Sequence, residues 1–216
     1  MQTSAPSPTT ALTARRAVHG PAIYGEPMHG TTPWKLDPAG AQALLTELFE
    51  PDADRLAHSI GVGRRAEHVA RALGRPELLV SAAYLHDIGY AAAARDTGLH
   101  QLDGARCLRA LGAPAALTGL VAHHTAATVE AAERGLDTIL RREFPEPSGD
   151  LLDLLTYCDM TTSARGEVVT VDERFDHIYD RYPPGHLVSR SMQRVEPGLR
   201  RIVSAVERRL ERPPLR

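Results

Sequence analysis

Apolar residues recur at intervals of three and four along most of the chain from residue 37 onward, which is the spacing of one helix face. The clearest run is His58, Val62, Ala66, Val69 and Leu73, in steps of four, four, three and four. The same pattern predicts further helices through residues 44–49, 79–86, 100–111, 117–128, 136–143, 150–163, 171–182 and 199–210. No segment alternates as a half-buried strand does, and no long unit repeats. The sequence therefore predicts an all-α helical bundle.

Capping residues predict where some of these helices begin and end. Asp37 followed by Pro38 is typical of a helix start, and Thr170 with Glu173 forms a capping box. Pro183-Pro184-Gly185 interrupts the helical pattern. We therefore expect an irregular tail over 1–36, a helical domain over 37–182 and a C-terminal helical extension over 183–216.

Composition places the chain among globular proteins and excludes some partners. Hydrophobic residues make up 43% and charged residues 24%, which is enough to build a core, whereas residues 1–36 are rich in Ser, Thr, Pro, Gly and Ala, with Trp34 as their expected anchor. The net charge of −2 gives no basic excess for duplex nucleic acid. Only two cysteines occur, and no apolar run reaches the about 18–20 residues that cross a membrane. We expect a cytoplasmic protein that binds neither a membrane nor duplex nucleic acid.

Histidine and aspartate residues fall on the apolar faces of five successive predicted helices. They are His58, His86 with Asp87, His100, His124 and Asp159. Burial of so many ionisable groups is costly unless a cation compensates it. Neutral imidazoles with carboxylates suit zinc, manganese, iron or cobalt, and six ligands are too many for one tetrahedral site. They fit two divalent transition-metal ions with a bridging carboxylate.

Two groups of motifs in this set resemble the HD domain superfamily. The first is His58, then Leu85-His86-Asp87-Ile88-Gly89, then Asp159, and this resemblance covers roughly residues 40–182. The segments that begin at His100 and at Val121 (Val-Ala-His-His-Thr) are similar to the two extra histidine motifs of dinuclear HD proteins. The resemblance implies an HD-domain helical bundle that binds two divalent ions, with iron, manganese and zinc as the leading candidates. One ion would take His58, His86, Asp87 and Asp159, and the other His100 and His124, with Asp87 bridging.

Some residues around this set have alternative interpretations. His123 and His124 point about 100° apart on a regular helix, so the apolar face favours His124 and leaves His123 as the alternative. The Gly-Tyr-Pro signature of cyclic-dinucleotide hydrolases is missing, and Tyr90 stands where that branch has lysine. Arg95 and Arg165 are candidate catalytic residues that would clamp a phosphate, as is Arg174.

The motifs favour a metal-dependent phosphohydrolase that cleaves a nucleotide or another small phosphate ester with a metal-activated water. A second hypothesis from the same resemblance is a mixed-valent diiron oxygenase acting on a small molecule. A third is a non-catalytic HD module that senses a ligand, which the complete set of candidate ligands disfavours.

Overall fold

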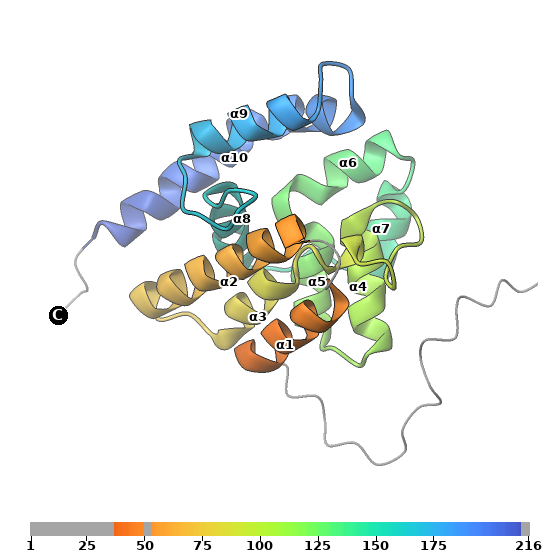
Figure 1. The fold of residues 1–216 in the computed structure, drawn as a ribbon, viewed down its shortest axis with the longest axis horizontal. Coiled ribbons are helices and arrows are strands. Elements are labelled where there is room, and N and C mark those ends of the chain that lie inside the picture. The colour runs from red at the N-terminus through yellow and green to blue at the C-terminus, as the bar shows by residue number, and fades with distance from the viewer. Residues whose placement is uncertain (1–36, 50–52, 213–216) are drawn as a thin grey trace, which may run out of the picture. The chain divides into compact units, whose positions relative to one another are not determined.

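A computed structural model describes residues 37–49 and 53–212 of the 216-residue chain (Figure 1). Trp34 and the predicted tail over 1–36 lie outside the described residues. The helices are α1 (Pro38–Leu48), α2 (Ala53–Leu73), α3 (Glu77–Leu85), α4 (His100–Ala110), α5 (Ala115–His123), α6 (Ala127–Glu133), α7 (Asp137–Glu143), α8 (Leu151–Met160), α9 (Val171–Arg181) and α10 (Leu187–Leu210). Two short 3-10 turns, η1 (Ile88–Tyr90) and η2 (His124–Ala126), join them. Apart from one isolated bridge between Thr162 and Val168, the described residues form no β-structure, so the predicted all-α class is confirmed.

The predicted caps form as the sequence indicates. The Asp37 carboxylate accepts a hydrogen bond from the backbone N–H of Gly40 at 2.8 Å, and Pro38 opens α1. At α9, the Thr170 hydroxyl accepts from the backbone N–H of Glu173 at 3.2 Å, and Oε2 of Glu173 accepts from the Thr170 N–H at 2.7 Å. These bonds satisfy N–H groups that a helix end leaves without partners.

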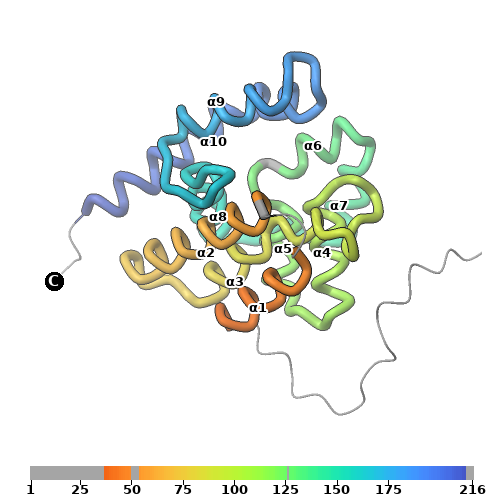
Figure 2. Tube along the Cα trace, viewed as in Figure 1, coloured from red at the N-terminus to blue at the C-terminus, as the bar shows by residue number. Residues whose placement is uncertain are grey.

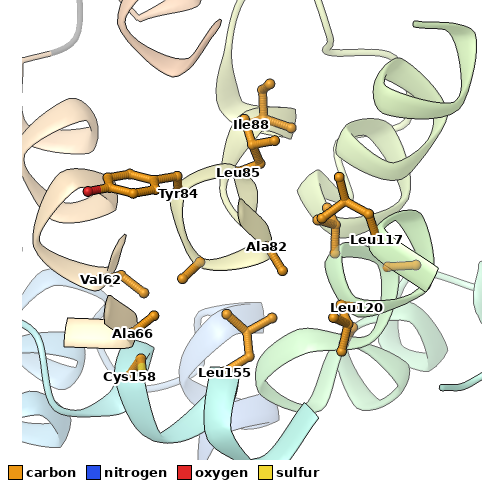
Figure 3. Packing of buried hydrophobic residues seen from close by; sticks show 14 of the residues in the cluster. Val62, Ala66, Ala82, Tyr84, Leu85, Ile88, Leu117, Leu120, Leu155 and Cys158 are labelled. Carbon is orange, nitrogen blue, oxygen red and sulfur yellow. The ribbon is translucent and has the colours of Figure 1, made fainter. Parts of the chain in front are cut away.

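The core lies where α2, α3, α5 and α8 pack together, and Figure 3 shows part of it. Its labelled side chains are Val62, Ala66, Ala82, Tyr84, Leu85, Ile88, Leu117, Leu120, Leu155 and Cys158, and all are buried. In the tube view of Figure 2, α9 and α10 run alongside each other, and α10 also packs against α6 and α8. The described residues contain no helix that combines the length and apolarity of a membrane span.

Several predicted helices end earlier than the hydrophobic pattern indicates, and two of these ends place candidate ligands. The prediction of one helix through 117–128 is wrong: α5 ends at His123, η2 follows, and Thr125 has φ 42° and ψ 55°. Likewise α3 ends at Leu85, so His86 and Asp87 lie at the junction with η1 rather than within a helix. Apolar spacing continues across such a break because both segments bury side chains in the same core. The spacing alone therefore does not reveal it.

Candidate metal centre

Six side chains predicted from the sequence meet at the ends of separate elements. We call this set, His58, His86, Asp87, His100, His124 and Asp159, the histidine–aspartate cluster. His100 is 11% exposed and the other five are buried. Five of them line one cavity of about 120 Å³, and His86 is fully buried beside them. The structure thus brings together residues that are up to about 100 positions apart in sequence.

The atoms of the cluster have the spacing of ligands around cations. Nε2 of His58 lies 3.1 Å from Oδ1 of Asp159, and Nε2 of His86 lies 4.0 Å from the same oxygen. One ligand atom each from His58, His86 and Asp159 lie within 4.8 Å of one another, and so do those of His86, Asp87 and His124. Ligands at about 2.0–2.2 Å from one cation are roughly 3–4 Å apart. Two such groups, sharing His86, fit this spacing.

Asp87 directs its two carboxylate oxygens to different histidines. Oδ1 lies 3.3 Å from Nε2 of His100 and 3.8 Å from Nε2 of His124, whereas Oδ2 lies 3.6 Å from Nε2 of His86. The nitrogens of His100 and His124 are themselves 3.3 Å apart. Asp87 therefore lies between His86 on one side and the pair formed by His100 and His124 on the other.

Backbone carbonyls orient three of the imidazoles. Nδ1 of His58 donates to the Ser163 carbonyl at 3.0 Å, and Nδ1 of His86 donates to that of Ala83 at 2.8 Å. Nδ1 of His124 donates to the Val121 carbonyl at 2.7 Å. A carbonyl can only accept, so in the neutral rings each proton is on Nδ1 and each Nε2 offers a lone pair to the cluster.

The donor set fits divalent cations. Nε2 of His86 is buried without a hydrogen-bond partner among the described residues, and it lies 3.6 Å from Oδ2 of Asp87 and 4.0 Å from Oδ1 of Asp159. A lone pair that faces carboxylate oxygens needs a positive charge between them. Nitrogen and oxygen donors in this mixture suit transition-metal ions.

The protonation states agree with this fit. Burial opposes ionisation of Asp87, but His86 and Arg55 outweigh it and hold the Asp87 pKa well below its ordinary value. Burial also opposes ionisation of Asp159, but the contacts with His58, His86 and Arg174 outweigh it and hold its pKa well below its ordinary value. Burial lowers the pKa of His100 and of His124, so these imidazoles are neutral. Ionised carboxylates and neutral imidazoles are the forms that bind metal.

The break after α5 separates the two adjacent histidines. His124 joins the cluster, whereas Nε2 of His123 donates to the Phe144 carbonyl at 2.6 Å and its ring lines a different cavity. The sequence favoured His124 from helical phase, and the structure places that ring beside Asp87. The turn at η2, rather than a continuous helix, gives this arrangement.

Gly89, in the motif that follows His86-Asp87, permits a close contact between η1 and α4. A Cβ at this position would lie 1.9 Å from the carbonyl oxygen of His100 and 2.7 Å from the backbone nitrogen of Gly104. Only glycine allows this approach, which brings the first residue of α4 next to Asp87.

Two of the arginines that the sequence predicted to clamp a phosphate lie away from the cavity. Arg95 is exposed, and its Nε donates to the Tyr90 carbonyl at 2.7 Å. Arg165 is also exposed, in the loop after α8, and neither residue lines the cavity. Both residues lie in loops, where closeness to a motif in the sequence does not determine which way a long side chain points. Arg174 from α9 does line the cavity, as the sequence allowed.

Arg55 and Thr125 are cavity residues that the sequence reasoning missed. Nη1 of Arg55 donates to Oδ2 of Asp87 at 2.8 Å, and its guanidinium lies 3.8 Å from the centre of the Tyr90 ring. Because Arg55 precedes His58 by three residues on α2, the helical period was a signal that could have identified it. Thr125 gave no such signal, since its position depends on the break at η2.

Comparison with known families agrees with this geometry. Residues 55–162, half of the chain, match the family model described as HD domain. The chain therefore belongs to the HD domain family. Comparisons with curated proteins and with solved structures gave no match. The match ends before α9, so the cavity wall from α9 and α10 lies outside the matched region.

Proposed function

We propose that the protein is a metal-dependent phosphohydrolase that cleaves a small phosphate ester, a nucleotide or another compound of this class. The observation that carries this proposal is the placement of Asp87, whose two oxygens face different histidines of the cluster. Membership of the HD domain family supports it, because HD domains are commonly metal-dependent hydrolases. The placement of Asp87 also supports the prediction, made from the sequence, that the chain binds two ions.

The cluster residues would hold the ions in two groups. His58, His86 and Asp159 would hold one, His100 and His124 the other, and Asp87 would contact both. Two bound divalent cations supply Lewis acidity, which lowers the pKa of water and offsets negative charge on phosphate oxygens. The backbone carbonyls behind three of the imidazoles keep their Nε2 atoms directed at the ions.

Two arginines would bind and orient the anionic substrate. Nη2 of Arg174 lies 3.2 Å from Oδ1 of Asp159 and 3.4 Å from Nε2 of His58, on the cavity wall. Arg55 enters the same cavity from α2. A guanidinium offers planar donors that match phosphate oxygens and stays charged at all physiological pH values. In this proposal Arg174 keeps the clamp role that the sequence predicted for it, and Arg55 takes that role in place of Arg95 and Arg165.

The test measures metal content and phosphate release together. The protein is reconstituted separately with manganese, iron and zinc, and each form is assayed against a panel of phosphate esters. We expect about two ions per chain and metal-dependent release of phosphate from at least one ester. The Asp87→Asn variant should lose both, because a neutral amide cannot hold two cations that repel each other. His68→Ala, an exposed histidine on α2, is the matched control and should behave as wild type.

Two outcomes would contradict the proposal. An Asp87→Asn variant with full metal content and activity would remove the bridging role. An iron-loaded protein that consumes oxygen with a small-molecule substrate, and releases no phosphate from any ester, would favour the diiron oxygenase instead.

A further inference from the structure

Several further polar side chains line the cavity of the histidine–aspartate cluster. Three of them are Tyr90 from η1, Gln101 from α4 and Glu130 from α6, and the others are Asp54, His177, Arg181 and Tyr182. The Tyr90 ring stacks on His100 with ring centres 4.2 Å apart, and Gln101 follows His100 directly in α4. These groups therefore surround the space next to the proposed metal ligands.

Tyr90, Gln101 and Glu130 each have hydrogen-bonding capacity that the described part of the chain does not use. Oε1 of Gln101 is buried without a partner, and the residue is only 3% exposed. Both bonds from Arg134 to Glu130, at 3.0 and 2.8 Å, go to Oε1. Oε2 of Glu130 and the Tyr90 hydroxyl receive no hydrogen bond from any described residue.

Unused acceptors in a buried wall indicate a ligand that donates. A buried polar atom without a partner is unfavourable, and an unpaired carboxylate oxygen is more so. The Glu130 side chain is 8% exposed, and its salt bridge with Arg134 fixes one oxygen and leaves the other for the cavity. An ionised carboxylate can only accept, whereas a glutamine amide can offer either its oxygen or its nitrogen. The group bound here must carry O–H or N–H.

The cavity has room for part of a ligand. It has a volume of about 120 Å³, it is partly open to solvent, and the proposed ions and a phosphate group would share this space. An apolar cavity of about 150 Å³ holds benzene, so only a few carbon atoms of an organic group would lie inside, and a longer group would extend through the open side. Apolar side chains from α9 and α10, namely Ile178, Val188 and Met192, supply a wall for those carbons.

We propose that the substrate is a phosphate ester whose organic part carries a hydroxyl or amino group, and that Glu130 and Gln101 bind this group. The inference rests on the proposed function, which places the phosphate at the cluster. Tyr90, between His100 and the guanidinium of Arg55, supplies a further hydroxyl to the same cavity.

The test compares three ligands that differ only at the end distant from phosphorus. Propylphosphonate, 3-hydroxypropylphosphonate and 3-aminopropylphosphonate have a C–P bond that resists hydrolysis, so binding is measured by calorimetry without turnover. The protein is loaded with manganese and kept anaerobic. We expect the hydroxyl or the amino compound to bind at least about tenfold more tightly than propylphosphonate. A comparison of the affinities of the hydroxyl and the amino compound then identifies the preferred donor.

Variants then assign this preference to residues. Glu130→Gln should reduce a preference for the amino compound at least about tenfold, because it removes the charge at nearly constant shape. Gln101→Leu should reduce the preference for either donor and leave propylphosphonate binding unchanged. Glu133→Gln, on the same helix and paired with Arg190 and Arg194, is the matched control. If Glu130→Gln does not fold, Gln101→Leu still tests the site.

The binding measurements distinguish a failure of this inference from a failure of the proposed function. Metal-dependent binding of all three ligands with equal affinity, or wild-type preferences in both variants, would overturn the donor-binding site and leave the phosphohydrolase proposal standing. If none of the three binds the metal-loaded protein, both proposals are wrong.

Discussion

The hydroxyl of Thr125 donates a hydrogen bond to Oδ2 of Asp159. Thr125 reaches this position with φ 42° and ψ 55°, in the left-handed region that a β-branched residue rarely enters and that costs about 1–3 kcal/mol. The bond fixes the carboxylate so that Oδ1 faces His58 at 3.1 Å. Since Thr125 directly follows His124, it links the two halves of the cluster.

Removal of the Thr125 hydroxyl should therefore weaken metal binding. Thr125→Val keeps the shape and the β-branch, and we expect its metal affinity to fall about 10–100-fold, as for other groups that orient metal ligands. Thr125→Ser keeps the hydroxyl and should bind metal within a few-fold of wild type. Chelator competition measures both affinities. Equal affinities for the two variants would show that the hydrogen bond has no part in positioning Asp159.

Replacement of His123 and replacement of His124 should have different effects on metal content, activity and stability. His124→Ala should remove about one metal equivalent and abolish phosphate release, since its Nε2 lies 3.8 Å from Asp87. His123→Ala should keep both ions and lower the free energy of unfolding by about 1–2 kcal/mol, because it loses the bond to the Phe144 carbonyl. Metal analysis and urea unfolding measure these effects. Loss of metal from the His123 variant alone would contradict the assignment.

Gly89→Ala should disturb both stability and the cluster. The new methyl group would lie 1.9 Å from the His100 carbonyl oxygen, so α4 must move away from η1 and the 3.3 Å approach of His100 to Asp87 is lost. We expect a loss of about 1–3 kcal/mol or more in the free energy of unfolding, together with weaker metal binding. Gly198→Ala is the control, because Gly198 lies inside α10 with open space around its Cα. That variant should be as stable as wild type or up to about 1 kcal/mol more stable.

We expect Glu143, at the end of α7, to make a contribution to the free energy of unfolding that depends on pH. Hydrogen bonds from Arg106 and Arg109 outweigh partial burial and lower the pKa of Glu143 from 4.5 to about 2. A lowered pKa in the folded state stabilises the protein above the ordinary value, and this contribution disappears as the pH falls from about 4.5 to about 2. Because Arg109 is half exposed, we expect Glu143→Gln to cost only about 1 kcal/mol at pH 7.

Urea unfolding at pH 7, 5, 4 and 3 follows the difference between Glu143→Gln and wild type. The difference should shrink across the acidic range. Glu146→Gln, whose side chain is 57% exposed, is the control and should change stability by less than about 0.5 kcal/mol at every pH. A Glu143→Gln effect that is constant from pH 7 to pH 3 would show that the carboxylate charge does not contribute.

The sequence by itself determined the all-α class, the helix starts at Asp37 and Thr170, and the six residues that meet in the cluster. The class and the helix starts depend on local spacing, because the helical period and the capping residues are written within a few positions of one another. The six cluster residues span about 100 positions, and they were identified from apolar helix faces and from motifs that resemble the HD domain superfamily. The tertiary structure decided the break at Thr125, the opposite directions of His123 and His124, and the entry of Arg55 into the cavity while Arg95 and Arg165 remain outside. These depend on contacts between segments distant in sequence, where the packing energy of α5, α6 and α8 outweighs the preference of a single residue for regular helix.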